Sequence, residues 1–456
     1  MRILLWHGYL LSGSGSNLYT VNISRIWRSE GHDVLLMCQE RNAGEFAFVD
    51  AAGGFNADNT GFELTQTGYE QATGRLRVLR PNIGEVLPVY VYDEYEGFTV
   101  KRFVDLTDEE LERYTSANIR AMVTAIEDHQ PDAIITGHEV MGPYIAKEAC
   151  DVTDASYIAK LHGSALEYAV KQQDRYLRLA QEGLSGARVV TGGSRYMVEE
   201  AARYVPGWRD RAAVVNPGCD VNLFKPFQEE KPDPPVVGYV GKFIQAKGVH
   251  NLLLSLSLVN RSFRATIVGY GGFERELKAI WDAVCRADTD ALEQLLQEGD
   301  GAPLREALDF VRDGRAGDRN LARAAGVRLD FPGRLDHGPL SRVLPGFSVL
   351  VVPSVVPEAF GMVAAEAAAC GVLPVVPRHS GIGEVGQVLE DALGMKGLLT
   401  YDPAAPIEGI AGALDRVLGS GRDTRREWEE IAVQTARRLW SWEHVAEQLL
   451  AHAAGR

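Results

Sequence analysis

The chain has 456 residues and a formal net charge of −15 at pH 7, from 47 basic and 62 acidic side chains. At roughly 100–200 residues per domain, this length predicts two or three domains. The composition, 46% hydrophobic and 24% charged, is that of a soluble globular protein and excludes wholesale disorder. The negative charge disfavours nucleic acid and anionic membranes as partners, because both require a basic surface. A small anionic ligand in a local basic pocket remains compatible with it.

Short apolar runs alternate with longer helical patterns along the chain. Candidate strands in the first half are 2–8, 33–38, 86–92, 132–136, 156–161, 187–191 and 212–216. Those in the second half are 236–241, 264–269, 327–332, 348–353, 372–376 and 397–400. Apolar strands separated by helices predict parallel sheets covered on both faces. The predicted fold class is therefore α/β, with two doubly wound domains.

Composition marks the boundary between these domains. Residues 218–235 are rich in proline and charge, which is typical of a linker. The predicted domains are 1–217 and 236–430, the second with a helical insertion at 282–325. The amphipathic segment 431–456 is predicted to be a terminal helix that crosses back to the first domain.

Five widely spaced cysteines include no C-x-x-C pair, which is typical of reduced thiols rather than of disulfides or a zinc site. The opening apolar run is short and lacks the cleavage site of a signal peptide. The nearly uncharged stretch 348–377 contains prolines and two glutamates, which predict a buried strand–helix–strand rather than a membrane span. We expect a cytoplasmic protein without an integral membrane segment.

A glycine-rich loop follows the first predicted strand. Gly13 and Gly15 precede a helix, where glycines let backbone amides approach an anionic ligand. A dinucleotide fingerprint requires a third glycine where this chain has Leu18. Glu40, near the end of the second strand, keeps a nicotinamide-binding alternative open. A tight turn that binds no ligand is the other alternative.

Two lysines flank the loop after the first strand of the second domain. Lys242 and Lys247 lie where a doubly wound fold binds phosphate, and their compact charges suit a diphosphate. Loop lysines are otherwise most often solvated. No P-loop pattern is present, so an ordinary ATPase is not supported.

The most informative segment runs from Pro357 to Gly371. Glu358 is predicted in a turn near a helix N-terminus, and Glu366 lies within a helix of alanine, valine and methionine. A buried carboxylate is costly unless it is hydrogen-bonded, and ligand hydroxyls such as those of a ribose would supply the bonds. The alternative is a structural cap at Glu358 and a Glu366 bonded to backbone.

Further polar loops follow other predicted strands. The amides around Ser380 and Gly381 are placed to contact phosphate or sugar, and His162 ends a strand at the edge where such sheets bind ligands. His138 and Glu139 end the preceding strand, but no second histidine follows at metal-ligand spacing, which disfavours zinc. The absence of a G-x-S-x-G elbow disfavours an α/β-hydrolase.

In this order, the motifs resemble the retaining glycosyltransferases of family 4, which have the GT-B fold. The most specific element is the pair Glu358 and Glu366, with Lys242, Lys247 and His162 in support. The resemblance implies two Rossmann-like domains facing each other across a cleft, with the acceptor on the first and the nucleotide sugar on the second. Lys242 stands where arginine is frequent, which keeps the charge but loses the fork geometry.

The resemblance also implies roles for single residues. Glu358 would contact donor-sugar hydroxyls, Glu366 the ribose, and Lys242 and Lys247 the diphosphate leaving group. His162 would lie beside the donor sugar and the acceptor. The implied catalytic set is Glu358, His162, Lys247 and Lys242. The other implied donor-binding residues are Gly13, Gly15, Phe360, Gly361, Met362, Val363, Glu366, Ser380 and Gly381.

The predicted activity is metal-independent transfer of a hexose from a nucleotide diphosphate sugar to an acceptor hydroxyl, with retained anomeric configuration. No cofactor is predicted, and the acceptor and oligomeric state are unassigned. The alternatives are a disaccharide phosphorylase or synthase, a noncatalytic sugar-nucleotide binding protein and an NAD-dependent dehydrogenase. The aromatic region 53–106 is predicted to help shape the acceptor side, although aromatic residues in loops as often pack locally.

Overall fold

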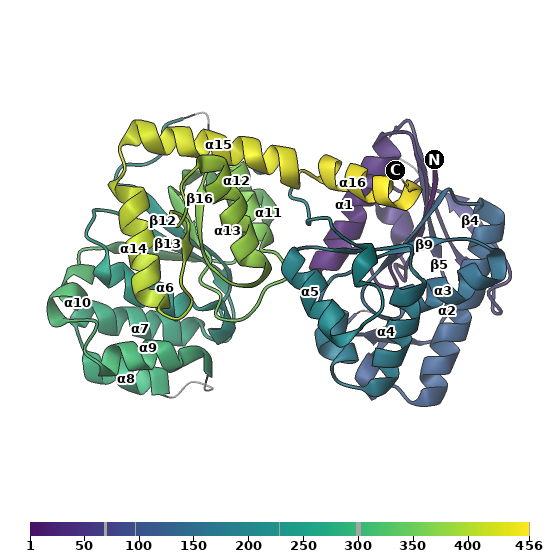
Figure 1. Ribbon diagram of the computed structural model, residues 1–456, viewed down its shortest axis with the longest axis horizontal. Coiled ribbons are helices and arrows are strands. Elements are labelled where there is room, and N and C mark those ends of the chain that lie inside the picture. The colour runs from purple at the N-terminus through teal and green to yellow at the C-terminus, as the bar shows by residue number, and fades with distance from the viewer. Residues whose placement is uncertain (68–70, 96, 228, 298–301, 456) are drawn as a thin grey trace. The chain divides into compact units, whose positions relative to one another are not determined.

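The computed structural model describes residues 1–67, 71–95, 97–227, 229–297 and 302–455. The chain forms two units, one of Met1–Pro217 with Trp442–Arg456 and one of Gly218–Ser441. Each unit is built on its own sheet with helices packed against it, and the strand pairs are parallel except for β3 with β4 (Figure 1). Within the described residues, no helix combines the length and the apolar character needed to cross a bilayer.

The sheet of the first unit has nine strands in the order β11-β10-β9-β8-β1-β2-β5-β3-β4. Its strands are β1 (Arg2–Trp6), β2 (Asp33–Met37), β3 (Ala51–Phe55), β4 (Phe62–Gln66), β5 (Arg75–Arg80), β8 (Ala133–Gly137), β9 (Tyr157–Lys160), β10 (Val189–Gly192) and β11 (Ala212–Val214). Strand β1 pairs in parallel with β2 and β8, and β8 with β9. The residues that follow these strands therefore lie along one edge of the sheet.

Three strands of this sheet, β3, β4 and β5, were not predicted. Their sequences contain glycines or alternate charged with apolar residues, so they lack the apolar run that marks the central strands. The strand predicted at 86–92 ends three residues early as β6 (Val86–Val89). It pairs with β7 (Thr99–Arg102) in a separate two-stranded sheet, not with the main one.

The helices of the first unit are α1 (Gly15–Ser29), α2 (Asp108–His129), α3 (Gly142–Thr153), α4 (Asp174–Gly186), α5 (Arg195–Tyr204) and α16 (Trp442–Ala454). Helix α16 supplies Trp442, Val445 and Leu449 to the core that Trp27 also enters. The Trp27 indole N–H donates to the Ala446 carbonyl at 3.1 Å, so the C-terminal segment is part of this unit.

The sheet of the second unit has six strands in the order β14-β13-β12-β15-β16-β17. They are β12 (Val236–Lys242), β13 (Arg264–Tyr270), β14 (Arg328–Gly333), β15 (Val349–Val351), β16 (Leu373–Pro377) and β17 (Thr400–Tyr401), all paired in parallel. Each overlaps a predicted strand. Apart from β14, whose residues are exposed or half-buried, these strands have buried apolar residues, which is why the sequence pattern located them.

The helices of the second unit are α6 (Val249–Leu258), α7 (Glu274–Arg286), α8 (Thr289–Gln297), α9 (Arg305–Arg312), α10 (Asp318–Ala324), α11 (His337–Val343), α12 (Met362–Ala369), α13 (Ser380–Leu393), α14 (Pro406–Gly419) and α15 (Arg422–Trp440). The region expected to form a helical insertion contains α8, α9 and α10. The single terminal helix expected at 431–456 is instead two helices, because α15 ends at Trp440 in this unit and α16 begins at Trp442 in the other.

Candidate active site

In the second unit, an ion pair joins the loop after β12 to the loop after β15. The Lys247 Nζ donates to Glu358 Oε1 at 2.9 Å, with the two side chains 32% and 17% exposed. The same loops are joined by the Val355 N–H, which donates to the Ala246 carbonyl at 3.0 Å. Gly248 makes this approach possible, because its φ is +66° and a Cβ there would clash with the Pro353 carbonyl oxygen.

The loop after β16 is bonded to the same glutamate through the backbone. The Glu358 N–H donates to Ser380 Oγ, and the Gly381 N–H donates to the Glu358 carbonyl, both at 2.9 Å. The structure therefore brings Glu358, Ser380 and Gly381, three of the residues predicted for the donor site, together. The Gly381 amide is already used within the protein, however, so it differs from the free donor that the sequence suggested.

Residues 360–363 lead from this loop into α12. The Phe360 ring is buried and packs against Trp440 with 5.9 Å between ring centroids, so it belongs to the core and presents only its backbone to a ligand. Gly361 precedes the first helical residue, Met362. The N–H groups of Met362 and Val363 have no acceptor within the helix, as in the first turn of any α-helix.

Glu366 lies on α12 with 7% of its surface exposed. Burial raises the pKa of its carboxyl to about 7. Its side chain makes no hydrogen bond or ion pair within the described part of the chain, so the backbone-bonded alternative is not observed. Burying this carboxyl without a hydrogen bond therefore costs free energy of folding, and hydrogen bonds from ligand hydroxyls would offset that cost.

Lys242 ends β12 and is exposed. Its side chain contacts no acidic group among the residues that the structure describes, in contrast to Lys247. The two lysines therefore differ, one being held by Glu358 and the other open to an anion.

In the first unit, three histidines follow the adjacent parallel strands β1, β8 and β9. The ring centroids of His7 and His138 are 6.1 Å apart, and those of His138 and His162 are 4.9 Å apart. The sequence singled out His162 and noted His138 only to disfavour zinc there, and it did not find His7. The available signal was that each follows a buried parallel strand at the edge where such sheets bind ligands.

Burial lowers the pKa of all three imidazoles. The pKa of His7 falls to about 4, and those of His138 and His162 lie well below the usual value, with neighbouring histidines adding to the effect. The rings are therefore neutral at pH 7, as hydrogen-bonding groups rather than cations. No group of three or more His, Cys, Asp or Glu side chains suited to a metal ion occurs in the described residues.

Glu139 organises the loop that carries His162. Its buried carboxylate accepts hydrogen bonds from the N–H groups of His162 at 3.0 Å, Gly163 at 2.6 Å and Leu166 at 3.3 Å. Nearby, burial lowers the pKa of Lys160 to about 7, and its Nζ donates to the Val215 carbonyl at 2.5 Å. These two buried groups were not predicted as part of the site.

The glycine loop after β1 is open. A Cβ added at Gly13 or Gly15 would meet no atom within 4 Å, and Ser14 caps α1 by accepting from the Asn17 N–H at 3.3 Å. Glu40 is engaged elsewhere, because its carboxylate accepts from the N–H groups of Leu11 and Asn42, both at 3.2 Å. The acidic residue that kept the nicotinamide alternative open thus links two loops of the protein.

The comparisons with known proteins agree with this architecture. A model described as glycosyl transferase 4-like domain matches residues 14–218, and one described as glycosyl transferases group 1 matches residues 315–435. No curated protein sequence matches the chain.

Several solved structures share the fold over nearly the whole chain. Sucrose-phosphate synthase from Thermosynechococcus elongatus is 19% identical with a TM-score of 0.57, covering 98% of this chain and 97% of its own. HepE from Anabaena in complex with UDP is 17% identical with a TM-score of 0.59, covering 100% of each chain. A glycosyltransferase from Rickettsia africae is 14% identical with a TM-score of 0.59, covering 98% of this chain and 97% of its own.

Two Rossmann-like units of this kind define the GT-B fold. The chain belongs to the family 4-like glycosyltransferases of group 1 and is a glycosyltransferase, which confirms the family and the fold class expected from the motifs.

Proposed function

We propose that the protein transfers a hexose from a nucleotide diphosphate sugar to an acceptor hydroxyl, with retention of the anomeric configuration and without a metal ion. The observation that carries the donor assignment is the buried Glu366 carboxyl, which has no hydrogen-bond partner among the described residues. A ribose diol would satisfy it. In support, the related HepE has been solved with UDP and with UDP-glucose.

The charged edge of the second unit suits the diphosphate. The Lys247 ammonium has three N–H donors. One donates to Glu358, which leaves two for phosphate oxygens. Lys242 adds a charge that no described acidic group offsets, and the first-turn amides of α12 add backbone donors. Groups held in place before the reaction stabilise a developing negative charge by several kcal/mol each, about 3 in measured cases.

The proposed reaction breaks the bond between the anomeric carbon of the donor and the diphosphate oxygen. The acceptor oxygen forms a new bond to the same carbon from the same face, and its proton passes to the departing phosphate. Glu358 would bind hydroxyls of the donor sugar, and the neutral His162 imidazole would contact the sugar and the acceptor. No side chain is then required as a separate general base.

The two units would close on the donor, with residues 218–235 as the hinge and the amides at Gly13 and Gly15 contacting the phosphates. We also propose a cytoplasmic location, in accord with five cysteines that are all free. A disaccharide synthase would use the same groups with a sugar phosphate as acceptor. The dehydrogenase alternative is disfavoured because Glu40 is occupied by backbone N–H groups.

Turnover tests this proposal. The protein is incubated with UDP-, GDP- and ADP-sugars, with and without candidate acceptors, and nucleotide release is followed by NMR in the presence and absence of EDTA. We expect release from one donor class, unchanged by EDTA, and a product whose anomeric coupling matches that of the donor. An inverted coupling, or release that EDTA abolishes, would contradict retention or metal independence respectively.

A further inference from the structure

A small aromatic pocket lies in the first unit, outside the groups discussed above. Its volume is about 520 Å³, and it is lined by Tyr92, Glu94, Tyr95, Phe98 and Val100. This volume falls in the range of small-molecule sites, roughly 300–1,000 Å³. Most of the lining belongs to the loop between β6 and β7.

This loop begins beside the histidines of the first unit. The Tyr90 hydroxyl donates to the Val140 carbonyl at 2.7 Å, directly after β8. The Tyr90 ring lies 5.0 Å from that of His138, which in turn lies 4.9 Å from His162. The loop that lines the pocket therefore starts at the edge of the sheet that carries His162.

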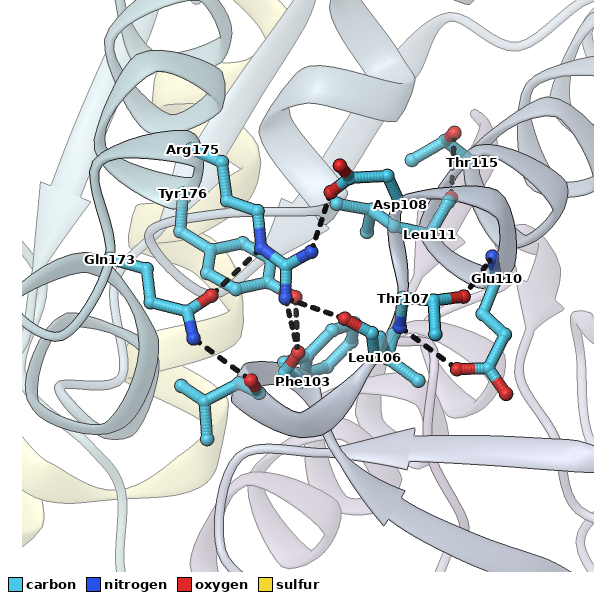
Figure 2. Close-up of polar contacts among 11 residues, drawn as sticks. Phe103, Leu106, Thr107, Asp108, Glu110, Leu111, Thr115, Gln173, Arg175 and Tyr176 are labelled. Atoms are coloured by element: carbon cyan, nitrogen blue, oxygen red, sulfur yellow. Dashed lines mark hydrogen bonds and ion pairs between the residues drawn. The ribbon is translucent and has the colours of Figure 1, made fainter.

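The far end of the loop is anchored as well. Figure 2 shows the segment after β7, where the Tyr176 hydroxyl and the Arg175 guanidinium both donate to the Phe103 carbonyl. Arg175 also donates to the Leu106 carbonyl at 2.8 Å and to Asp108 at 2.9 Å (Figure 2). These bonds hold the segment that follows β7, and the start of α2, to α4. Val100 of β7 lines the pocket and lies close in sequence to this fixed segment, and a lining residue that is held in advance loses less entropy when a ligand binds.

The lining offers aromatic faces together with polar groups. Tyr92 is 58% exposed, and the hydroxyls of Tyr92 and Tyr95 have no hydrogen-bond partner within the described residues. The Arg41 guanidinium lies 4.0 Å from the Phe98 ring centroid. The absence of a side chain at Gly97 leaves room for the Arg41 guanidinium, because a Cβ at this position would lie 2.8 Å from Arg41 Nη1.

A saccharide matches this combination. One face of a sugar ring presents C–H groups that pack on an aromatic ring, and its rim presents hydroxyls that hydrogen-bond to carboxylate and phenol groups. The charge is less suited to a phosphate, because the one charged side chain among the described lining residues is Glu94, an acid, and Asp93 precedes it in the sequence.

We propose that this pocket is the acceptor subsite and that the acceptor is a saccharide without a phosphate group. The proposal rests on the proposed transferase function, whose acceptor it specifies. It separates this chain from enzymes whose acceptor is a sugar phosphate.

Binding of sugars without donor tests the pocket directly. The full chain is screened by saturation-transfer NMR against methyl glycosides of glucose, galactose and mannose, against maltose and cellobiose, and against glucose 6-phosphate. Affinities of the best uncharged sugar are then measured for the wild type and for Tyr92→Ala, Tyr92→Phe, Glu94→Gln and a control, Tyr204→Ala, which alters an exposed tyrosine at the end of α5.

We expect an uncharged sugar to bind more tightly than glucose 6-phosphate. Tyr92→Ala should weaken its binding about 3- to 10-fold, because a stacking contact of roughly 1 kcal/mol is lost. Tyr92→Phe should stay within about twofold of wild type, Glu94→Gln should weaken binding, and Tyr204→Ala should have no effect.

Equal binding by wild type and Tyr92→Ala, or preferential binding of glucose 6-phosphate, would overturn the proposal. So would the absence of sugar binding in a protein that binds a nucleoside diphosphate. Failure to bind any nucleoside diphosphate, with the sugar results as expected, would instead refute the proposed donor and leave the saccharide pocket standing.

Discussion

The two candidate binding edges differ in how they handle charge. The edge of the second unit carries Lys247 and Glu358 as a partly exposed ion pair and an open Lys242. The edge of the first unit gathers His7, His138 and His162, whose pKa values are lowered by burial. The edge of the second unit therefore carries charged side chains, and the histidines at the edge of the first unit are neutral. This division fits an anionic donor on one unit and an uncharged acceptor on the other.

The largest expected effect comes from removing the cation of the ion pair. Lys247→Ala should lower kcat about 100- to 1,000-fold, as loss of one preorganised donor does in other enzymes. Steady-state turnover with the best donor measures it. Lys278→Ala, which removes a surface lysine paired with Glu274 on α7, is the matched control and should behave as wild type. Near-normal turnover by Lys247→Ala would mean that the diphosphate lies elsewhere.

The second prediction concerns the buried carboxyl on α12. The folded-state pKa of Glu366 is raised from 4.5 to about 7, so the folded protein binds more protons than the unfolded chain between these values. The contribution of this group to stability is therefore lost as pH rises through that window. Glu366→Gln has no carboxyl to titrate at this position. Its free energy of unfolding, relative to that of the wild type, should therefore increase from pH 4.5 to 7 by at most about 3 kcal/mol.

Urea unfolding of ligand-free wild type and Glu366→Gln across this pH range checks the prediction. A stability difference that does not change with pH would show that Glu366 is ionised at no cost in the folded protein. The donor argument drawn from its burial would then fail.

A third prediction tests the neutral edge. Because burial lowers the pKa of His138 and His162 well below the usual value, their imidazole NMR signals should not titrate between pH 8 and pH 6. His138→Asn and His162→Asn variants assign the two signals. A midpoint at or above pH 7 for either ring would make this edge substantially cationic at pH 7 and erase the contrast between the two units.

Much of the fold followed from the sequence, and the reason is physical. Central strands such as β1, β8 and β12 are buried on both faces and leave an apolar run that is easy to locate. Strand β4 has no buried residue, β5 places an arginine between its buried leucine and valine side chains, and β3 contains adjacent glycines, so their pattern was missed. The pairing of 86–89 with 99–102 depends on contacts between segments that no local pattern encodes.

The site was predicted in its residue types more than in its contacts. The motifs indicated Lys247 and Glu358 separately, but their ion pair joins residues 111 positions apart, which spacing does not reveal. His7 was missed because the first strand was predicted over residues 2–8, which placed His7 inside the strand, whereas β1 ends at Trp6. Glu40 kept a nicotinamide-binding alternative open, whereas folding brings the Leu11 amide to its carboxylate.

The smallest expected effect concerns that residue. Glu40→Gln keeps one side-chain acceptor for the Leu11 and Asn42 amides, so the free energy of unfolding should fall by only about 1 kcal/mol. Thermal shift with NAD should show no stabilisation of either protein. Stabilisation of the wild type by NAD but not by a nucleotide sugar would revive the dehydrogenase alternative and reverse the roles given to the two edges.

Calorimetric titration with nucleoside diphosphates tests the central claim most directly, because it isolates the charged edge from turnover and acceptor. We predict saturable binding of one of UDP, GDP or ADP to the wild type. The affinity should fall at least about tenfold in both Lys247→Ala and Glu366→Ala and remain unchanged in Lys278→Ala. Equal affinity in all four proteins, or no binding of any nucleoside diphosphate, would contradict the placement of the donor on the second unit.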